Sequence, residues 1–299
     1  MQNSDLLNEI EKAHYILLVT NKDLNISSIT SSLALSNYFY ENKIKHKIFN
    51  LSSQLPRKLN FLSKFDKITK DIPKYYDLVI YLDCPDQYIN ELALLNEVKS
   101  ISIDSSMGNI SELLYSFFKV NKLEISKNTA ECLYVGIYSE SLGFTSPEIT
   151  NKVFTIAAEL LDCNINISEI SDNLSKRESL AKVKTIPKVM NTLELFSEGK
   201  LATVYLDGLC LDETGADINE CNDIVDIVLS IGIVNVVAYF RVKENTVSIL
   251  LRSKNSLDLT LIASALNAKG DKNTLNLNIS SSNINEVKEE IVKIILNYI

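Results

Sequence analysis

Glycine and histidine are scarce in this sequence, and each shortage restricts the kinds of site that it can build. The 299 residues include only 8 glycines and two histidines, His14 and His46. Because a typical protein has roughly 7% glycine, loops that bind phosphate through several glycine backbones are hard to assemble here. Two histidines are too few for a site with several imidazole ligands, and we expect both to be solvated.

Cysteines and long apolar runs are limited too. The five cysteines are odd in number and have no CxxC spacing, which predicts reduced, mostly buried thiols and argues against a zinc site. No run approaches the roughly 20 apolar residues of a membrane span. The polar, acidic start MQNSDLLNEIEKAHY does not resemble a signal peptide. We therefore expect a cytoplasmic protein without a membrane span.

Positive charge is also in deficit. The chain has 30 Lys and Arg against 38 Asp and Glu, a formal net charge of −8. Long nucleic acids are bound largely through contacts of Lys and Arg with phosphate. We therefore do not expect a large surface for long nucleic acid, although a local basic cleft for a short ligand fits this balance.

The first half of the chain alternates apolar strands with helical segments. We predict strands at 15–20, 47–51, 77–83 and 100–104, and helices at 27–40, 110–119, 126–140 and 168–180. This alternation predicts a parallel sheet with helices on its faces. At 299 residues the chain is long enough for two hydrophobic cores.

The pattern changes in the last third. We predict a helix over 181–198, kinked or broken at Pro187. Strands at 201–206, 234–242 and 246–251 follow, with helices at 219–231, 259–267 and 283–298. The predicted fold class is therefore α/β, with a parallel-sheet domain over 1–180, a helical linker over 181–199 and a smaller mixed-sheet domain over 200–299.

Polar segments follow three of the predicted strands, at the carboxyl ends where parallel α/β sheets bind ligands. They are NKDLNIS (21–27), DCPD (83–86) and DSSMGN (104–109). Two further segments are AECLYVGIYSESLGF (130–144) and LLRSKNSLDLTLIASALNAKGDKNTLN (250–276). In this order the five segments resemble motifs of the DHH/DHHA1 phosphoesterase superfamily, in its RecJ-like nanoRNase and pAp-phosphatase branch. The resemblance covers nearly the whole chain.

The resemblance implies a DHH domain, a DHHA1 domain and two divalent metal ions, usually manganese, held by His and Asp side chains. Most of those ligand positions are altered in this chain. The positions of the degenerate site are Asn21, Asn25, Ser27, Asp83, Asp104, Ser105, Ser106 and Glu140. Asp83 is the one ligand kept intact, and Glu140 stands in place of an Asp. Asp104 and Asn109 are supporting groups in the family.

Two carboxylates cannot fix two metal ions about 3.5–4 Å apart. From these substitutions we predict no bound metal and no other cofactor, with Asp83 and Glu140 as the ligands if any metal binds. The prediction that follows is a catalytically inactive family member.

The C-terminal motif has changed in the same direction. Its glycine-rich signature is replaced by Asn267-Ala268-Lys269-Gly270-Asp271, which leaves a single glycine. The candidates for a remaining ligand-binding site are Asn109, Arg252, Ser253, Lys254, Lys269 and Gly270.

Several of these residues also have a purely structural interpretation. Asp83 and Asp104 are typical of turns and helix starts, and Arg252 can pair with a neighbouring acid. Ser105 and Ser106 lack a histidine nearby in sequence that would act as a base.

Three functions remain open from the sequence. The first is a protein-binding scaffold or regulatory component, with a protein partner and a possible homodimer. The second is a nucleotide or short-RNA binding module that uses Arg252, Lys254 and Lys269. The third is a weak phosphoesterase that uses Asp83, Asp104 and Glu140 with a single metal ion.

Overall fold

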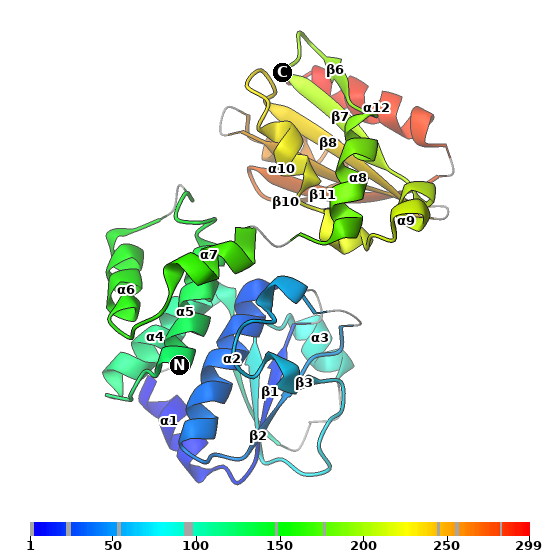
Figure 1. The fold of residues 1–299 in the computed structure, drawn as a ribbon. Helices are drawn as coiled ribbons and strands as arrows, with labels where there is room; N and C mark the ends of the chain where they lie inside the picture. Colours follow the sequence, from blue (N-terminus) through cyan, green and yellow to red (C-terminus); the bar gives the residue numbers. More distant parts are fainter. Residues whose placement is uncertain are drawn as a thin grey trace. The chain divides into compact units, whose positions relative to one another are not determined.

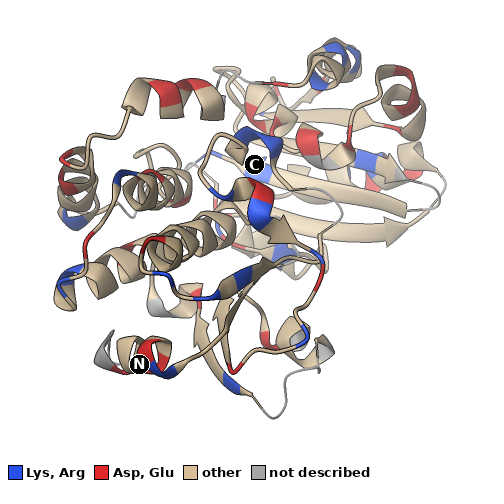
Figure 2. Cartoon of the chain, turned by 60° about the horizontal axis from the view of Figure 1, so that its bottom comes forward, with Lys and Arg blue, Asp and Glu red and all other residues tan. Residues whose placement is uncertain are grey.

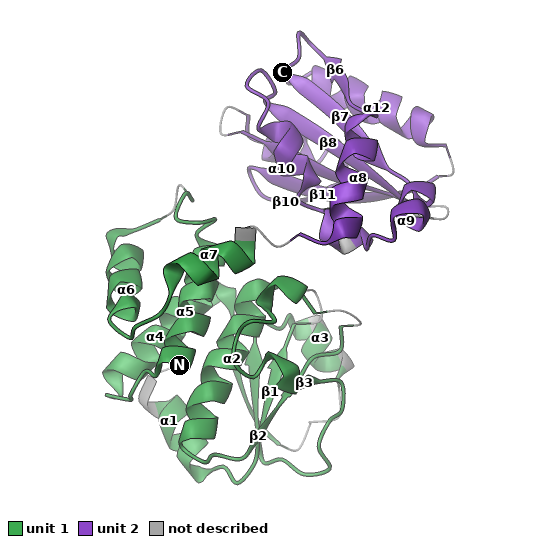
Figure 3. Ribbon diagram, in the orientation of Figure 1, with its two compact units in different colours: residues 1–177 green, residues 178–299 purple. Residues whose placement is uncertain are grey.

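The computed structural model describes residues 3–21, 25–52, 55–92, 98–146, 149–175, 178–243, 246–254, 257–281 and 283–299. The chain divides into two compact units, residues 1–177 and 178–299 (Figure 3). Each unit has its own β-sheet and its own hydrophobic core. The predicted α/β class, with one parallel and one mixed sheet, is confirmed.

Unit 1 is built on a parallel sheet of five strands in the order β3-β2-β1-β4-β5 (Figure 1). The strands are β1 (Ile16–Thr20), β2 (His46–Phe49), β3 (Ile68–Thr69), β4 (Leu78–Leu82) and β5 (Lys99–Ile103). The direction in which strands are added reverses between β1 and β4, which pair from Ile16↔Leu78 to Thr20↔Leu82. Open α/β sheets bind ligands at such a switch point, outside the carboxyl ends of the strands.

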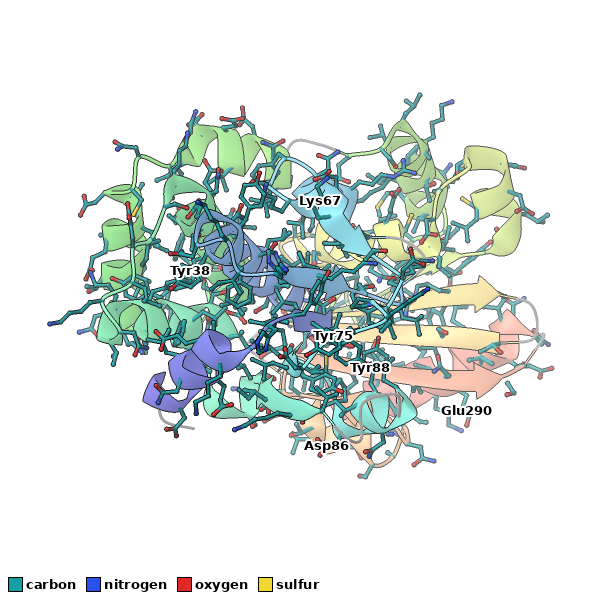
Figure 4. All side chains as sticks on the ribbon, turned by 90° about the horizontal axis from the view of Figure 1, so that it is seen from below. Tyr38, Lys67, Tyr75, Asp86, Tyr88 and Glu290 are labelled. Atoms are coloured by element: carbon teal, nitrogen blue, oxygen red, sulfur yellow. The ribbon has the colours of Figure 1, made fainter. Side chains whose placement is uncertain are left out.

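Helices cover both faces of this sheet. They are α1 (Asn3–Lys12), α2 (Ile26–Glu41), α3 (Asp86–Glu91), α4 (Ile110–Val120), α5 (Lys127–Glu140), α6 (Asn151–Leu161) and α7 (Ile167–Ser175). Ile16 and Leu18 of β1 join the core beneath α1, α2, α4 and α5, whereas Leu17 and Val19 face the cluster that contains Tyr88 of α3 (Figure 4). Because both faces are buried, β1 and β4 read as continuous apolar runs.

Helix α2 is almost entirely buried although much of it is polar. Its buried polar residues are Ser27, Ser28, Thr30, Ser31, Ser32, Ser36 and Asn37. These small side chains let α5 and α4 approach closely. A Cβ added at Gly136 of α5 would lie 2.0 Å from Ser111 Oγ and 2.8 Å from Thr30 Oγ1. The close packing brings the end of α5 beside the start of α2.

Unit 2 has a six-stranded sheet in the order β10-β11-β9-β8-β7-β6. Its strands are β6 (Glu194–Phe196), β7 (Leu201–Leu206), β8 (Val236–Lys243), β9 (Thr246–Ser253), β10 (Lys269–Gly270) and β11 (Thr274–Ser280). Strands β7 and β8 pair in parallel and the other neighbours are antiparallel. Its helices are α8 (Leu180–Met190), α9 (Gly208–Thr214), α10 (Ile224–Leu229), α11 (Thr260–Ala263) and α12 (Ile284–Leu296).

The structure corrects the prediction of one helix over 181–198. Helix α8 continues through Pro187 and ends at Met190, and residues Glu194–Phe196 form the edge strand β6. The chain turns at this point because Glu194, Leu195 and Phe196 pair with β7, a tertiary contact that overrides local helix preference. The sequence analysis also missed α1, β3, α3, α9, β10 and β11.

The two histidines differ in their surroundings. The imidazole of His14 is exposed and pairs with Asp77 at 2.9 Å. The prediction for His46 is wrong. Its ring hydrogen-bonds to Ser36 Oγ at 2.7 Å and to Ile44 O at 2.8 Å. Burial lowers the pKa of His46.

Two further expectations concern thiols and membranes. All five cysteines are free thiols, and Cys84, Cys132 and Cys221 are buried. No helix in the described part of the chain is long and apolar enough to cross a bilayer. Figure 2 shows acidic and basic residues scattered over helices, strands and loops of the chain.

Candidate active site

Asp83 lies directly after β4, at the edge where the sheet order reverses. Its φ of 54° is in the left-handed region, which Asp tolerates better than most residues. The backbone N–H of Asp83 donates to Ile103 O at 2.9 Å, which fixes the residue to the end of β5. Its Oδ1 accepts the Ser105 backbone N–H at 3.2 Å, and its Oδ2 accepts the Asn25 side-chain amide. Asp83 therefore connects the segments that follow β1, β4 and β5.

Asn25 is the N-cap of α2, which begins at Ile26. Its Oδ1 accepts the backbone N–H of Ser27 at 2.9 Å. This bond determines the orientation of the amide, because only an oxygen can accept from a backbone N–H. The Nδ2 group therefore faces Asp83 as a donor.

Glu140 is the last residue of α5 and comes to the same place from the other side of α2. The hydroxyl of Ser27 donates to its Oε1. Its Oε2 is buried and has no hydrogen-bond partner. Burial raises the pKa of Glu140 to about 7, hydrogen bonds from Ser27 and the Ile110 backbone oppose that rise, and the negative charge of Asp83 adds to it. A carboxyl group with this pKa exchanges a proton near neutral pH.

The residues of the segment DSSMGN (104–109) have structural roles. Asp104 caps the short 3-10 helix η3 (Ser105–Met107) by accepting the Ser106 backbone N–H at 3.0 Å, as its structural interpretation predicts. The Ser105 and Ser106 side chains are exposed. Asn109 caps α4 through the Glu112 N–H at 3.0 Å, which places the start of α4 against Glu140.

Asn21 directly follows β1, and Ser28 lies in the first turn of α2. The Asn21 N–H donates to Ser28 Oγ at 3.0 Å, and Ser28 in turn donates to Leu82 O at 2.6 Å. The sequence analysis did not select Ser28, although its place one residue after Ser27 in the first turn of α2 was a usable signal.

The candidates in unit 2 have partners of their own. Arg252 pairs with Asp226 at 3.5 Å, as its structural interpretation predicts, and Lys254 Nζ donates to Ile231 O at 2.8 Å. The hydroxyl of Ser253 donates to Leu257 O at 2.8 Å. Gly270 lies where β10 meets β11. A Cβ added at this position would be 2.0 Å from Thr274 O. Lys269 is exposed.

The two-metal cluster implied by the family does not fit these donors. Within the described ranges there is no group of three or more His, Cys, Asp or Glu side chains that could hold a metal ion. What the described side chains do bring together are two carboxyl groups, Asp83 and Glu140, and the pKa of the second is raised.

Known proteins give the family context. No family model matches the chain. The bifunctional oligoribonuclease and PAP phosphatase NrnA of Bacillus subtilis is 24% identical over 155 residues, which cover 51% of this chain and 49% of that protein. The NrnA of the same description from Thermus thermophilus is 20% identical over 191 residues, 64% of this chain and 57% of that protein. The chain thus matches about half the length of these relatives.

Solved structures agree on the fold. An exopolyphosphatase-related protein from Bacteroides fragilis has a TM-score of 0.84 at 19% identity. The matched part covers 99% of this chain and 94% of that protein. RecJ in complex with Mn²⁺ from Thermus thermophilus has a TM-score of 0.53 at 13% identity. The matched part covers 98% of this chain and 53% of that RecJ chain. The predicted resemblance to the DHH/DHHA1 phosphoesterase superfamily is confirmed.

The prediction of a catalytically inactive protein is contradicted. The curated relatives are named as enzymes that act on phosphate esters, and they give no support to a scaffold role. The prediction counted lost ligands by position. It overlooked that Asn25 and Ser27 contact the carboxylates of Asp83 and Glu140 directly.

Proposed function

We propose that this protein of the DHH/DHHA1 superfamily is a phosphoesterase that hydrolyses short oligoribonucleotides or adenosine 3′,5′-bisphosphate (pAp). The curated relatives are named for these two activities. The observation that carries the proposal is the Asp83–Glu140 pair, whose second member keeps one buried, unpartnered oxygen. Hydrolysis of a phosphate ester requires proton transfer, and Glu140 is the group suited to it.

Glu140 acts in this scheme as the general acid–base. Since its pKa is about 7, the carboxylate accepts a proton from the attacking water and the carboxylic acid returns one to the leaving oxygen. Burial is the main cause of the raised pKa of Glu140, and the negative charge of Asp83 adds to it. The start of α2, a helix of 16 residues at the same edge, favours the phosphate through its partial positive charge.

Direct assay of the purified chain tests the proposal. Hydrolysis of pAp and of a short oligoribonucleotide is followed by phosphate release and chromatography, with added Mn²⁺ and with EDTA. Glu140→Gln should lower kcat on the order of 10²–10⁴-fold, which is the usual contribution of acid–base catalysis, and Asp83→Asn should lower it as well.

Glu131→Gln is the matched control. Glu131 is a partly buried glutamate on the same helix α5, and burial raises its pKa as well. This variant should keep full activity. Wild-type protein without activity on either substrate, or equal losses in all three variants, would contradict the proposal.

A further inference from the structure

We infer that Asn25 and Ser27 are positioning residues that hold Asp83 and Glu140 by direct hydrogen bonds, so that this site assembles without a divalent cation. The inference rests on the proposed function for its catalytic meaning. Its structural part concerns how two neighbouring carboxylates are held, and it has a test of its own.

The orientation of Asn25 is the first argument. The oxygen of an amide can ligate a hard cation, whereas its NH₂ group cannot. Here the amide oxygen is committed to the Ser27 N–H at 2.9 Å, and the NH₂ group points to Asp83 Oδ2. A hydrogen-bond donor therefore already occupies Asp83 Oδ2. Turning the amide over would remove the cap of α2.

The second argument is that both oxygens of Asp83 are satisfied. Oδ2 accepts from Asn25, and Oδ1 accepts the Ser105 N–H at 3.2 Å. Both carboxylate oxygens of Asp83 are therefore held by hydrogen-bond donors of this chain.

Ser27 provides the third argument. Its side chain is buried, at 2% exposed, and its hydroxyl donates to Glu140 Oε1. The hydroxyl of Ser27 therefore interacts with the carboxylate as a donor, where a cation would otherwise bind. Glu140 keeps Oε2 free of hydrogen bonds, so the bond from Ser27 orients the group and leaves one oxygen for proton transfer.

Metal binding by the purified wild-type chain is the decisive measurement. After dialysis against EDTA, titration with MnCl₂ should give no binding heat, and the Tm should change by less than about 1 °C with either MnCl₂ or EDTA. A Tm increase with MnCl₂ that is lost in Glu140→Gln would overturn the inference. That result would leave the proposed phosphoesterase function standing, whereas absence of hydrolysis would leave this inference standing.

A designed reversal strengthens the test. The double variant Asn25→Asp/Ser27→Asp puts carboxylates where the two donors were, beside Asp83 and Glu140. Its Tm should fall by roughly 5 °C or more without metal because like charges then face each other. MnCl₂ should restore the Tm, since a cluster of carboxylates binds hard cations. Asn60→Asp, at an exposed position, is the control and should not respond to MnCl₂.

Positioning by Ser27 has a separate readout. Ser27→Ala removes a hydrogen bond that lowers the pKa of Glu140, so the pH–rate profile should shift to higher pH. Ser27→Thr keeps the hydroxyl and should retain the wild-type profile. An unshifted profile in Ser27→Ala would contradict the role of Ser27. If that variant does not fold, the MnCl₂ titration of the wild-type chain still decides the inference.

Discussion

The hydroxyl of Ser27 donates a hydrogen bond to the carboxylate of Glu140, across 113 positions of the sequence. One residue lies in the first turn of α2 and the other at the end of α5. The contact exists because small polar residues on α2 and Gly136 on α5 let the two helices pack closely. The proposed acid–base site at this edge of the sheet therefore depends on helix packing as well as on the strand ends.

Glu140 should make the protein less stable as pH rises. The native state, with a pKa of about 7 against 4.5 for an unperturbed Glu, binds a proton that the unfolded chain has already released. The stability that this group contributes is fully present below pH 4.5 and is lost as pH rises through about 7. The loss amounts to about 3 kcal/mol at 1.36 kcal/mol per pKa unit.

The variant Glu140→Gln tests whether stability falls as pH rises. The free energy of unfolding of the variant relative to wild type should increase by about 2 kcal/mol between about pH 5 and about pH 8, measured by urea denaturation. Glu124→Gln, at an exposed position, should show no such trend. A difference for Glu140→Gln that stays constant with pH would disprove the assignment.

Asp83 should tolerate Asn far better than Ala. Asn retains the left-handed conformation at φ 54° and can still accept from Ser105. Ala loses the bonds to Asn25 and Ser105 and incurs about 1 kcal/mol of backbone strain. Thermal unfolding should therefore show a loss of about 2–3 kcal/mol for Asp83→Ala. The loss for Asp83→Asn should be smaller, and equal losses would contradict this explanation.

Gly136→Ala should destabilise unit 1, although Gly→Ala in a helix interior usually stabilises by up to about 1 kcal/mol. The added Cβ would lie 2.0 Å from Ser111 Oγ, 2.8 Å from Thr30 Oγ1 and 3.1 Å from Ser111 Cβ, so these side chains or the helices that carry them must shift. We expect a loss of about 1–3 kcal/mol in denaturant unfolding together with reduced activity, because Glu140 lies on the same helix as Gly136. Gly208→Ala has no atom within 4 Å of the new Cβ and is the control. A neutral Gly136→Ala would disprove the close packing.

Lys182 should matter much more than Lys188. The Lys182 side chain is 5% exposed and bonds to Asp223 at 2.6 Å and Glu178 at 2.8 Å. Although burial opposes the charged form, the hydrogen bonds that Lys182 donates to these carboxylates raise its pKa overall. Lys182→Ala should cost about 2–4 kcal/mol of stability. Lys188 pairs with Glu213 at the surface, and Lys188→Ala should change stability by less than about 1 kcal/mol. Similar effects of both variants on urea unfolding would refute the distinction.

The sequence by itself determined the fold class and most of the framework. Apolar runs such as 77–83 predicted β4, and the periodicity of 27–40 and 126–140 predicted α2 and α5, because these signals act between residues close in sequence. The order of motifs also predicted the superfamily and selected Asn25, Ser27, Asp83 and Glu140 as one group. The strand β6 was mistaken for helix because only its pairing with β7 makes it a strand.

Only the tertiary structure shows how Asn25 and Ser27 interact with Asp83 and Glu140. Read position by position, Asn25 and Ser27 counted as lost ligands, and the sequence led to a prediction of inactivity that the relatives contradict. In the folded chain the same two residues are hydrogen-bond donors to Asp83 and Glu140. The raised pKa of Glu140 arises first from its burial. Burial and hydrogen-bond partners come from elements distant in sequence, so neither follows from the identity of the residue.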